Sequence, residues 1–111
     1  MSKRERDKGL RGELEVKHFF EDHRWSMRGL EGEGDHIATK WRMINGLIDP
    51  NAPALVVHVE VKRQERLALP AWLRQAEGEA PDGTVPVVCF RQSRSKWYVA
   101  VELEKLLELI G

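Results

Sequence analysis

The run "ALVVHVEVKRQ" at residues 54–64 constrains the fold more than any other stretch of the chain. Its valines predict a buried strand, because branched side chains pack well on a pleated surface. Alternate residues of a strand point to the same face, so Glu60 and Lys62 project side by side, with His58 behind them. The other face takes Leu55, Val57, Val59 and Val61. An acid and an amine at the end of an apolar strand form either a structural ion pair or part of a site.

The length and composition suit one globular domain, 1–111, with a single core, because 41% of the residues are hydrophobic and 32% are charged. The longest apolar run is far shorter than the ~20 residues that span a bilayer, and residues 1–10 do not lead into the apolar segment of a signal peptide. The single cysteine, Cys89, predicts a buried thiol in a reducing compartment and excludes a disulfide or a cysteine zinc site within one chain. We therefore expect a cytoplasmic protein without a membrane segment.

Acidic residues concentrate in the middle of the chain, although the formal net charge is zero. Residues 29–60 carry more acids than bases, whereas residues 1–28 and 61–97 carry more bases than acids. An acidic metal site inside a basic rim is typical of an enzyme that cuts nucleic acid, and ordinary surface charge explains such small excesses equally well. Residues 1–8 are either a flexible basic arm that reaches DNA or a frayed terminus.

Hydrophobic periodicity divides the chain into eight elements in the order α-β-β-β-α-β-β-α. Helices are expected at 4–23, 70–80 and 102–110, and strands at 25–30, 35–41, 54–64, 85–91 and 96–101. The Asn-Gly and Asp-Pro pairs in residues 44–53 indicate a loop or a hairpin end. The second helix should turn Leu69, Trp72, Leu73 and Ala76 inward, and the last one Leu103, Leu106, Leu107 and Ile110. The fold class is therefore α/β or α+β, with a central mixed sheet flanked by helices.

Three acids occupy unusual places in this layout. Glu13 lies on the inward face of the first helix, whereas Glu15 points almost the opposite way, toward water. Asp35 opens a strand after the turn-prone "EGEG", and Glu60 lies on the central strand. The inward helix face also carries Leu10, Val16, Lys17 and Phe20. The three acids are therefore candidates for one site.

A hard cation would account for these acids. Mg²⁺ prefers carboxylate and carbonyl oxygens, so Asp35, Glu60 and the backbone carbonyl of Val61 could hold it, with Mn²⁺ as a substitute. Lys62 would orient or deprotonate a water and offset the charge that develops on a phosphate. Because removing carboxylates from water is unfavourable unless cations compensate, the metal and Lys62 would also stabilise the buried acids.

The pattern of these residues resembles a known family. "GD" at 34–35 followed by "EVK" at 60–62 resembles the PD-(D/E)xK nuclease pattern, and the layout "RGELEVKHFFEDHRWSMRGLEGEGDHIA" and then "VVHVEVKRQ" is similar to archaeal-type Holliday-junction resolvases and related small phage nucleases. The resemblance covers the chain from about Gly12 to Val101 and implies a restriction-endonuclease-like core. It also implies that Glu13, Asp35 and Glu60 are metal-site acids and that Lys62 is the catalytic lysine.

The resemblance has departures and extensions. Gly34 replaces the proline of the family pattern, and the insertion at 41–54 is longer than a simple hairpin turn. Gln75 resembles a glutamine that some nuclease branches place near the site, but Glu79 stands where one branch has a tyrosine, so that branch assignment fails. Candidate DNA contacts are Arg11, Arg28, Arg63, Gln64, Arg66 and Gln75.

Other polar residues have weaker claims. Glu31 and Glu33 compete with Asp35 as ligands, although acids in a glycine-rich turn are usually solvated. The four histidines, His18, His23, His36 and His58, show no metal-ligand spacing. His58 shares the face of Glu60, where packing in the sheet is the simpler interpretation.

The sequence thus predicts a Mg²⁺-dependent, structure-specific DNA endonuclease that resolves four-way junctions, acting in recombination, repair or phage genome processing in a bacterial, archaeal or phage-infected cell. Such resolvases are homodimers, and residues 97–99 or the last helix could form the dimer contact. One alternative is a nuclease of the same type that acts on linear duplex, flap or single-stranded DNA. A second alternative is a non-catalytic DNA-binding or assembly module that keeps the nuclease fold.

Overall fold

The computed structural model describes residues 2–30 and 35–110. These residues form helices and strands in the predicted order α-β-β-β-α-β-β-α. The helices are α1 (Lys3–Asp22), α2 (Leu69–Glu79) and α3 (Leu103–Ile110), and the strands are β1 (Trp25–Gly29), β2 (Asp35–Ile44), β3 (Leu47–Arg63), β4 (Val85–Arg91) and β5 (Tyr98–Ala100).

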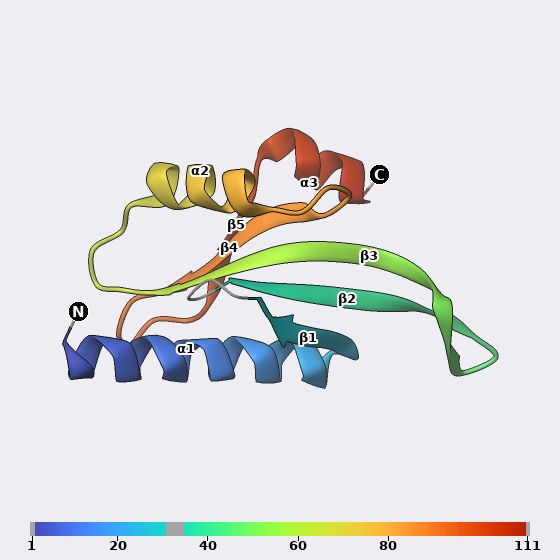
Figure 1. Ribbon diagram of the computed structural model, residues 1–111, viewed down its shortest axis with the longest axis horizontal. Coiled ribbons are helices and arrows are strands. Elements are labelled where there is room, and N and C mark those ends of the chain that lie inside the picture. The colour runs from blue at the N-terminus through green and yellow to red at the C-terminus, as the bar shows by residue number, and fades with distance from the viewer. Residues whose placement is uncertain (1, 31–34, 111) are drawn as a thin grey trace.

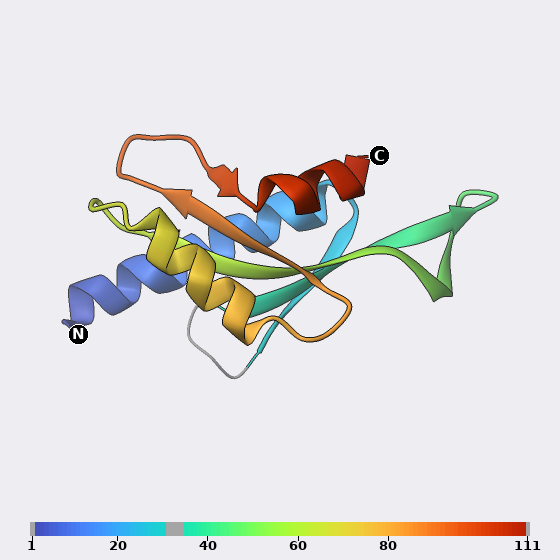
Figure 2. The same cartoon turned by 90° about the horizontal axis from the view of Figure 1, so that it is seen from above.

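The strands form one mixed sheet in the order β1-β2-β3-β4-β5. β3 and β4 run parallel, because α2 connects them across the sheet, and the remaining pairs are antiparallel. α1 covers one face of the sheet, whereas α2 and α3 lie on the other side (Figure 1). Seen from above, α2 crosses β3 and β4, and α3 follows β5 at the margin (Figure 2). The predicted α+β class and the restriction-endonuclease-like arrangement are confirmed.

The main core lies between α1 and the sheet. Val16 of α1 is buried against Val57, Val59 and Val61 of β3, the apolar set that the alternation of the strand predicts. The remaining buried members of this cluster are Met27, Ala38, Val87 and Cys89. Cys89 is a free, buried thiol, as predicted.

A smaller apolar cluster lies under α2 on the opposite face. Trp72 and Ala76 are buried against Val88 of β4, and Leu69 and Leu73 pack at their edge. These are the four inward positions that the sequence predicts for this helix. The helix has a proline in its first turn, where the missing amide hydrogen costs no hydrogen bond.

The stretch at 41–54 is a β-hairpin arm, so of the two predicted alternatives for residues 44–53, a loop or a hairpin end, the hairpin end is confirmed. β2 and β3 continue past the predicted ends to a two-residue turn, Asn45 and Gly46, whose φ angles of 52° and 78° suit a type I′ hairpin. The arm extends beyond the helices (Figure 1). Pro53 pairs with Trp41 there at a register shift, where a missing backbone donor is tolerated. The shift explains why the arm was not predicted as strand.

Two helices bury less apolar surface than their patterns predict. On α1, Leu10, Leu14 and Phe19 are exposed, and no residue of α3 is buried. α1 instead approaches the sheet along a narrow line through Gly12, where an added Cβ would lie 3.0 Å from Cβ of Arg63. Within the described residues, no helix combines the length and the apolar character that crossing a membrane requires.

Candidate active site

The pairing of β2 with β3 brings Asp35 and Glu60 together. The two residues are direct partners in the antiparallel register, so their side chains share a face of the sheet. Both are buried, with 8% of Asp35 and 0% of Glu60 exposed. Asp35 is the first residue of its strand, which places the pair at the end of the β2–β3 ladder.

Lys62 follows Glu60 on the same face of β3 and is partly exposed. Burial raises the pKa of Glu60 to about 8, and the nearby carboxyl of Glu79 acts in the same direction. The positive charge of Lys62 opposes this rise without cancelling it. One lysine therefore does not compensate the acids that gather at this point of the sheet.

Glu79 reaches the pair from the last turn of α2. The neighbouring carboxyl of Glu60 lowers the pKa of Glu79. The side-chain amide of Gln75 donates to Glu79 Oε1 over 3.3 Å and adds to this effect. Two carboxyl groups this close repel each other when both are ionised, and a cation between them would remove that repulsion.

His58 lies beside these acids with 0% of its surface exposed. Its Nε2 lies against Oδ1 of Asp35, and neither ring nitrogen has a hydrogen-bond partner among the described residues. One ligand atom each from Asp35, His58 and Glu79 lies within 4.8 Å of the others. This cluster, which we call the Asp-His-Glu cluster, joins β2, β3 and α2.

Glu13 lies on the α1 side of the sheet. Nε2 of His36 donates a hydrogen bond to Glu13 Oε1 over 2.9 Å. His36 follows Asp35 directly in β2, so its side chain lies on the opposite face of the strand. Burial lowers the pKa of His36, although the charge of Asp35 acts against this. Within the described part of the chain, Glu13 is not a member of the Asp-His-Glu cluster.

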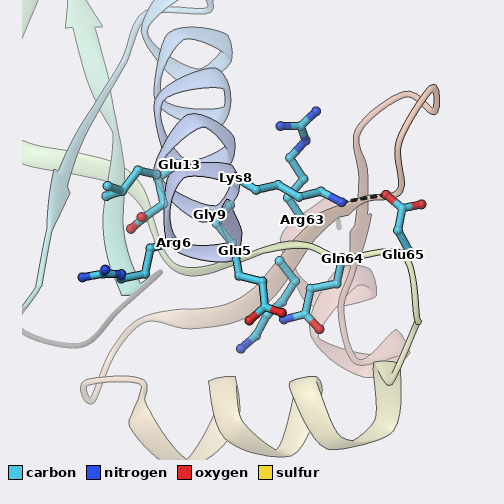
Figure 3. A pocket seen from close by; sticks show the side chains of 11 residues that line it. Glu5, Arg6, Lys8, Gly9, Glu13, Arg63, Gln64 and Glu65 are labelled. Atoms are coloured by element: carbon cyan, nitrogen blue, oxygen red, sulfur yellow. Dashed lines mark hydrogen bonds and ion pairs between the residues drawn. The ribbon is translucent and has the colours of Figure 1, made fainter. Parts of the chain in front are cut away.

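Glu13 and Lys62 nevertheless line one hollow of about 570 Å³ between the first half of α1 and the end of β3. Figure 3 shows the hollow, with side chains from both elements around it. Its other charged and polar lining residues are Glu5, Arg6, Lys8, Arg63, Gln64 and Glu65. Lys8 and Glu65 form an ion pair of 2.8 Å at one side. The hollow therefore combines basic groups with acids and opens beside Lys62.

The predicted DNA contacts are distributed over several surfaces. Arg63 and Gln64 line the hollow, and Gln75 is bound to Glu79. Arg28 lines a second depression with Glu13 and His36. Arg11 and Arg66 are exposed.

Sequence reasoning missed some contacts and misplaced one residue. The proximity of Glu79 to Glu60 was not predicted, although its spacing from Gln75 places both on one face of α2. Glu15 does not point freely to water, because Arg91 Nη1 and Trp97 Nε1 donate to its carboxylate over 2.7 and 2.8 Å. These partners come from β4 and the following loop, which no local pattern on α1 reveals. Glu31, Glu33 and Gly34 lie outside the described residues.

The residues at this end of the sheet fit a divalent cation. Asp35 and Glu60 are buried acids whose charges are incompletely compensated, and buried carboxylates are costly without a cation. Their oxygens are the donors that Mg²⁺ and Mn²⁺ accept. The partly exposed Lys62 and the hollow beside it give a phosphate access to the same edge.

Comparison with known proteins agrees with this chemistry. Residues 4–110 match the model of a family described as "Phage putative PDDEXK endonuclease". The match spans nearly the whole chain and includes Asp35, Glu60 and Lys62. Among curated proteins, none matches the chain.

Proposed function

The chain belongs to this family of phage PD-(D/E)xK endonucleases, and from that premise we propose that it is a metal-dependent endonuclease that hydrolyses phosphodiester bonds in DNA. The observation that carries the proposal is the register of β2 and β3, which sets Asp35 against Glu60 with Lys62 on the same face. An acid pair and a lysine at the open end of a sheet can hold a cation and a phosphate together.

Each residue has a distinct part in this reaction. Asp35, Glu60 and the backbone carbonyl of Val61 supply oxygens for Mg²⁺ or Mn²⁺. A metal held by these oxygens would supply Lewis-acid stabilisation of the phosphate and activation of a water. Lys62 orients the attacking water, and its ammonium offsets the negative charge that develops on the phosphate. The partial exposure of Lys62 lets it meet a substrate that arrives from solvent.

Glu13 is proposed as a third acid of the same site, acting from α1. Its position on the wall of the hollow that Lys62 also lines supports this role. The hydrogen bond from His36 orients its carboxylate, as partners of metal ligands commonly do.

The DNA backbone would approach across the hollow between α1 and β3. Arg63 and Gln64, at the end of the strand that carries Glu60, are proposed phosphate contacts. Arg6 and Lys8 of α1 also line the hollow, and Figure 3 shows Lys8 paired with Glu65 at one side of it. Contacts of this kind fix the position of a duplex and carry no sequence preference. More distant proposed contacts are Arg11, Arg28, Arg66 and Gln75.

A branched substrate, the four-way junction, is the proposed natural target. Its resolution requires two cuts, which a two-fold symmetric dimer supplies with two sites. The exposed apolar side chains of α3, together with Tyr98 and Val99 on the edge strand β5, are the proposed dimer contact. An unpaired edge strand and an uncovered apolar helix face are surfaces that proteins commonly bury on assembly.

Cleavage of labelled DNA tests both parts of the proposal, the metal-dependent endonuclease activity and the preference for four-way junctions. Equal concentrations of a four-way junction and a matched linear duplex are incubated with Mg²⁺, Mn²⁺ or EDTA. We expect metal-dependent cutting of the junction and a loss of about 10²–10⁴-fold in Lys62→Ala. Lys40→Ala, an exposed lysine on β2 to which no role is assigned, is the matched control.

The outcomes separate the alternatives. Equal cutting of the junction and the linear duplex would support the proposal that the protein is a nuclease, and it would contradict the proposed preference for junctions. A lack of metal-dependent cutting on junction, duplex, flap and single-stranded DNA, together with unchanged DNA binding by Asp35→Ala, would identify a non-catalytic DNA-binding module and end the proposal.

A further inference from the structure

We propose that His58 and Glu79 join Asp35 as direct ligands of the metal, so that the centre has a nitrogen donor beside its oxygens. The proposal rests on the proposed function, because it concerns the cation that a nuclease of this type would use. It adds two residues that the acid-lysine pattern of the sequence does not include. The Asp-His-Glu cluster, in which the three ligand atoms lie within 4.8 Å of one another, is the geometric basis.

The burial of His58 is the first argument. An imidazole with no exposed surface has left water entirely, which is unfavourable unless both ring nitrogens find partners. Nε2 lies against Asp35, and neither ring nitrogen has a hydrogen-bond partner among the described residues. If His58 only filled space, a valine or leucine would pack there at lower cost. Its place against Asp35 is better explained by a ligand role.

A structural Asp35–His58 pair is the simpler competing interpretation. Such a pair would satisfy one nitrogen of His58 and one oxygen of Asp35, and nothing more. It leaves unexplained why α2 ends with Glu79 beside Asp35 and His58. Two carboxyl groups around one imidazole, with Glu60 next on the same face of β3, form an arrangement that a divalent cation stabilises and a lone ion pair does not.

Glu79 adds a ligand from α2 to the Asp-His-Glu cluster, whose other members come from β2 and β3. Because Glu79 is exposed, it also connects the cluster with solvent. Its side chain is exposed at the end of α2, whereas Asp35 and His58 are buried. The amide of Gln75 donates to Glu79 Oε1 and so orients the carboxylate, as a supporting residue around a metal does. A cation could therefore enter past Glu79 and bind between the helix and the sheet.

A nitrogen donor predicts the metal preference of the centre. Imidazole favours Mn²⁺ and later transition metals over Mg²⁺, which prefers an octahedron of oxygens. We expect the protein to bind Mn²⁺ more tightly than Mg²⁺ in the absence of DNA. The ratio of the two affinities should fall in His58→Gln, because the substitution removes the imidazole nitrogen.

Pulsed EPR of bound Mn²⁺ tests the ligand directly and without any cleavage assay. A coordinated imidazole produces nitrogen modulation of the electron spin echo, which changes when the protein carries ¹⁵N-labelled histidine. To assign the signal, we would substitute His18, His23 and His36 by alanine, which leaves His58 as the single histidine of the chain. This design avoids a substitution at the fully buried position. We expect the modulation and its isotope shift in both proteins.

Calorimetric titration with Mn²⁺ tests Glu79. Glu79→Gln should weaken binding by at least about tenfold, the loss typical for residues around a metal. Glu77→Gln is the matched control, because Glu77 is an exposed acid two residues earlier on the same helix and lies outside the cluster. An equal affinity of the two variants, or a Mn²⁺ complex without nitrogen modulation, overturns the inference.

The same titrations separate this inference from the proposed function. If Mn²⁺ binding depends on Asp35 and Glu60 but not on His58 or Glu79, the nuclease site stands and the mixed-donor centre is wrong. If wild-type protein binds neither Mn²⁺ nor Mg²⁺ in the presence or absence of DNA, both proposals fail.

Discussion

The two faces of β3 contrast sharply, although their residues alternate along one strand. Val57, Val59 and Val61 face α1 and form the main core, whereas His58 and Glu60 are just as buried on the side of α2. The first face gains stability from the removal of apolar surface from water. The second removes charged groups from water, which opposes folding. Because successive side chains of a strand point to opposite faces of the sheet, β3 can stabilise the fold with one face and present reactive groups on the other.

The helix above each face explains how the contrast is tolerated. α1 contributes Val16 to an apolar contact, and α2 contributes both an apolar cluster around Trp72 and the acid Glu79. The α2 cluster includes Val88, the register partner of Glu60 on β4, so apolar packing adjoins the acids directly. Packing around the acids holds them in place when their own charges oppose burial.

The largest expected contrast is between Lys62→Ala and Val59→Ala. Loss of the lysine should reduce cleavage by about 10²–10⁴-fold with little effect on the free energy of unfolding, because Lys62 is partly exposed. Loss of the valine methyl groups should lower the free energy of unfolding by about 2 kcal/mol and leave the cleavage rate per folded molecule unchanged. Urea denaturation and single-turnover cleavage measure the two effects. A comparable loss of activity in Val59→Ala would contradict the separation of the faces.

Glu60→Gln should change stability in the direction opposite to Val59→Ala. In EDTA, the amide can donate to Glu79 without adding a buried charge, so the urea midpoint should equal or exceed that of the wild type. Saturating Mn²⁺ should stabilise the wild type, by about 2.7 kcal/mol at a hundredfold excess over its dissociation constant, and stabilise the variant much less. Thermal unfolding with and without the metal measures this. A variant that is less stable in EDTA would show that Glu60 supports the fold.

Glycine substitutions on α1 test how closely that helix approaches its face of the sheet. Gly12→Val should lower the free energy of unfolding by about 1–3 kcal/mol, because the new side chain would collide with Arg63 and Trp97. Gly9→Ala, where an added Cβ meets nothing within 4 Å, should raise it by about 1 kcal/mol through helix propensity. Urea denaturation of both variants supplies the comparison. Equal effects of the two substitutions would mean that the close approach at Gly12 does not constrain packing.

The predictable part of the molecule is the part that local periodicity determines. Alternation along residues 54–64 predicts the buried valines and places Glu60 beside Lys62, and the turn signals predict the order of the elements. The site roles of Glu13, Asp35, Glu60 and Lys62 stay predictions, although the register sets two of the acids face to face. Contacts that depend on docking could not be read from the sequence.

Glu79 and Glu15 show why docking contacts were missed. Each gains its partners from an element distant in sequence, Glu79 from β3 and Glu15 from β4 and the residues after it. The exposed leucines of α1 illustrate the same limit, because an amphipathic pattern gives the direction of a face and not the width of the contact. The hairpin end was one of the two predicted alternatives, but the length of its arm was not predicted, because the register shift interrupts the alternation that identifies a strand.

The smallest expected effect is the change in the urea midpoint caused by a substitution of Glu65, an exposed acid just beyond the end of β3. Its pKa shift is opposite in direction to that of Glu60. Hydrogen bonds from Lys8 first, and then from the hydroxyl and the backbone amide of Ser93, lower the pKa of Glu65 to about 2, whereas burial raises that of Glu60. A carboxyl whose pKa is lower in the folded than in the unfolded state stabilises the fold above about pH 4.5, and this contribution is lost as the pH falls toward about 2. Glu65→Gln should therefore shift the urea midpoint slightly downward near neutral pH, and the difference from wild type should shrink in acid. A difference that persists or grows at low pH would show that Glu65 acts through packing and not through its charge.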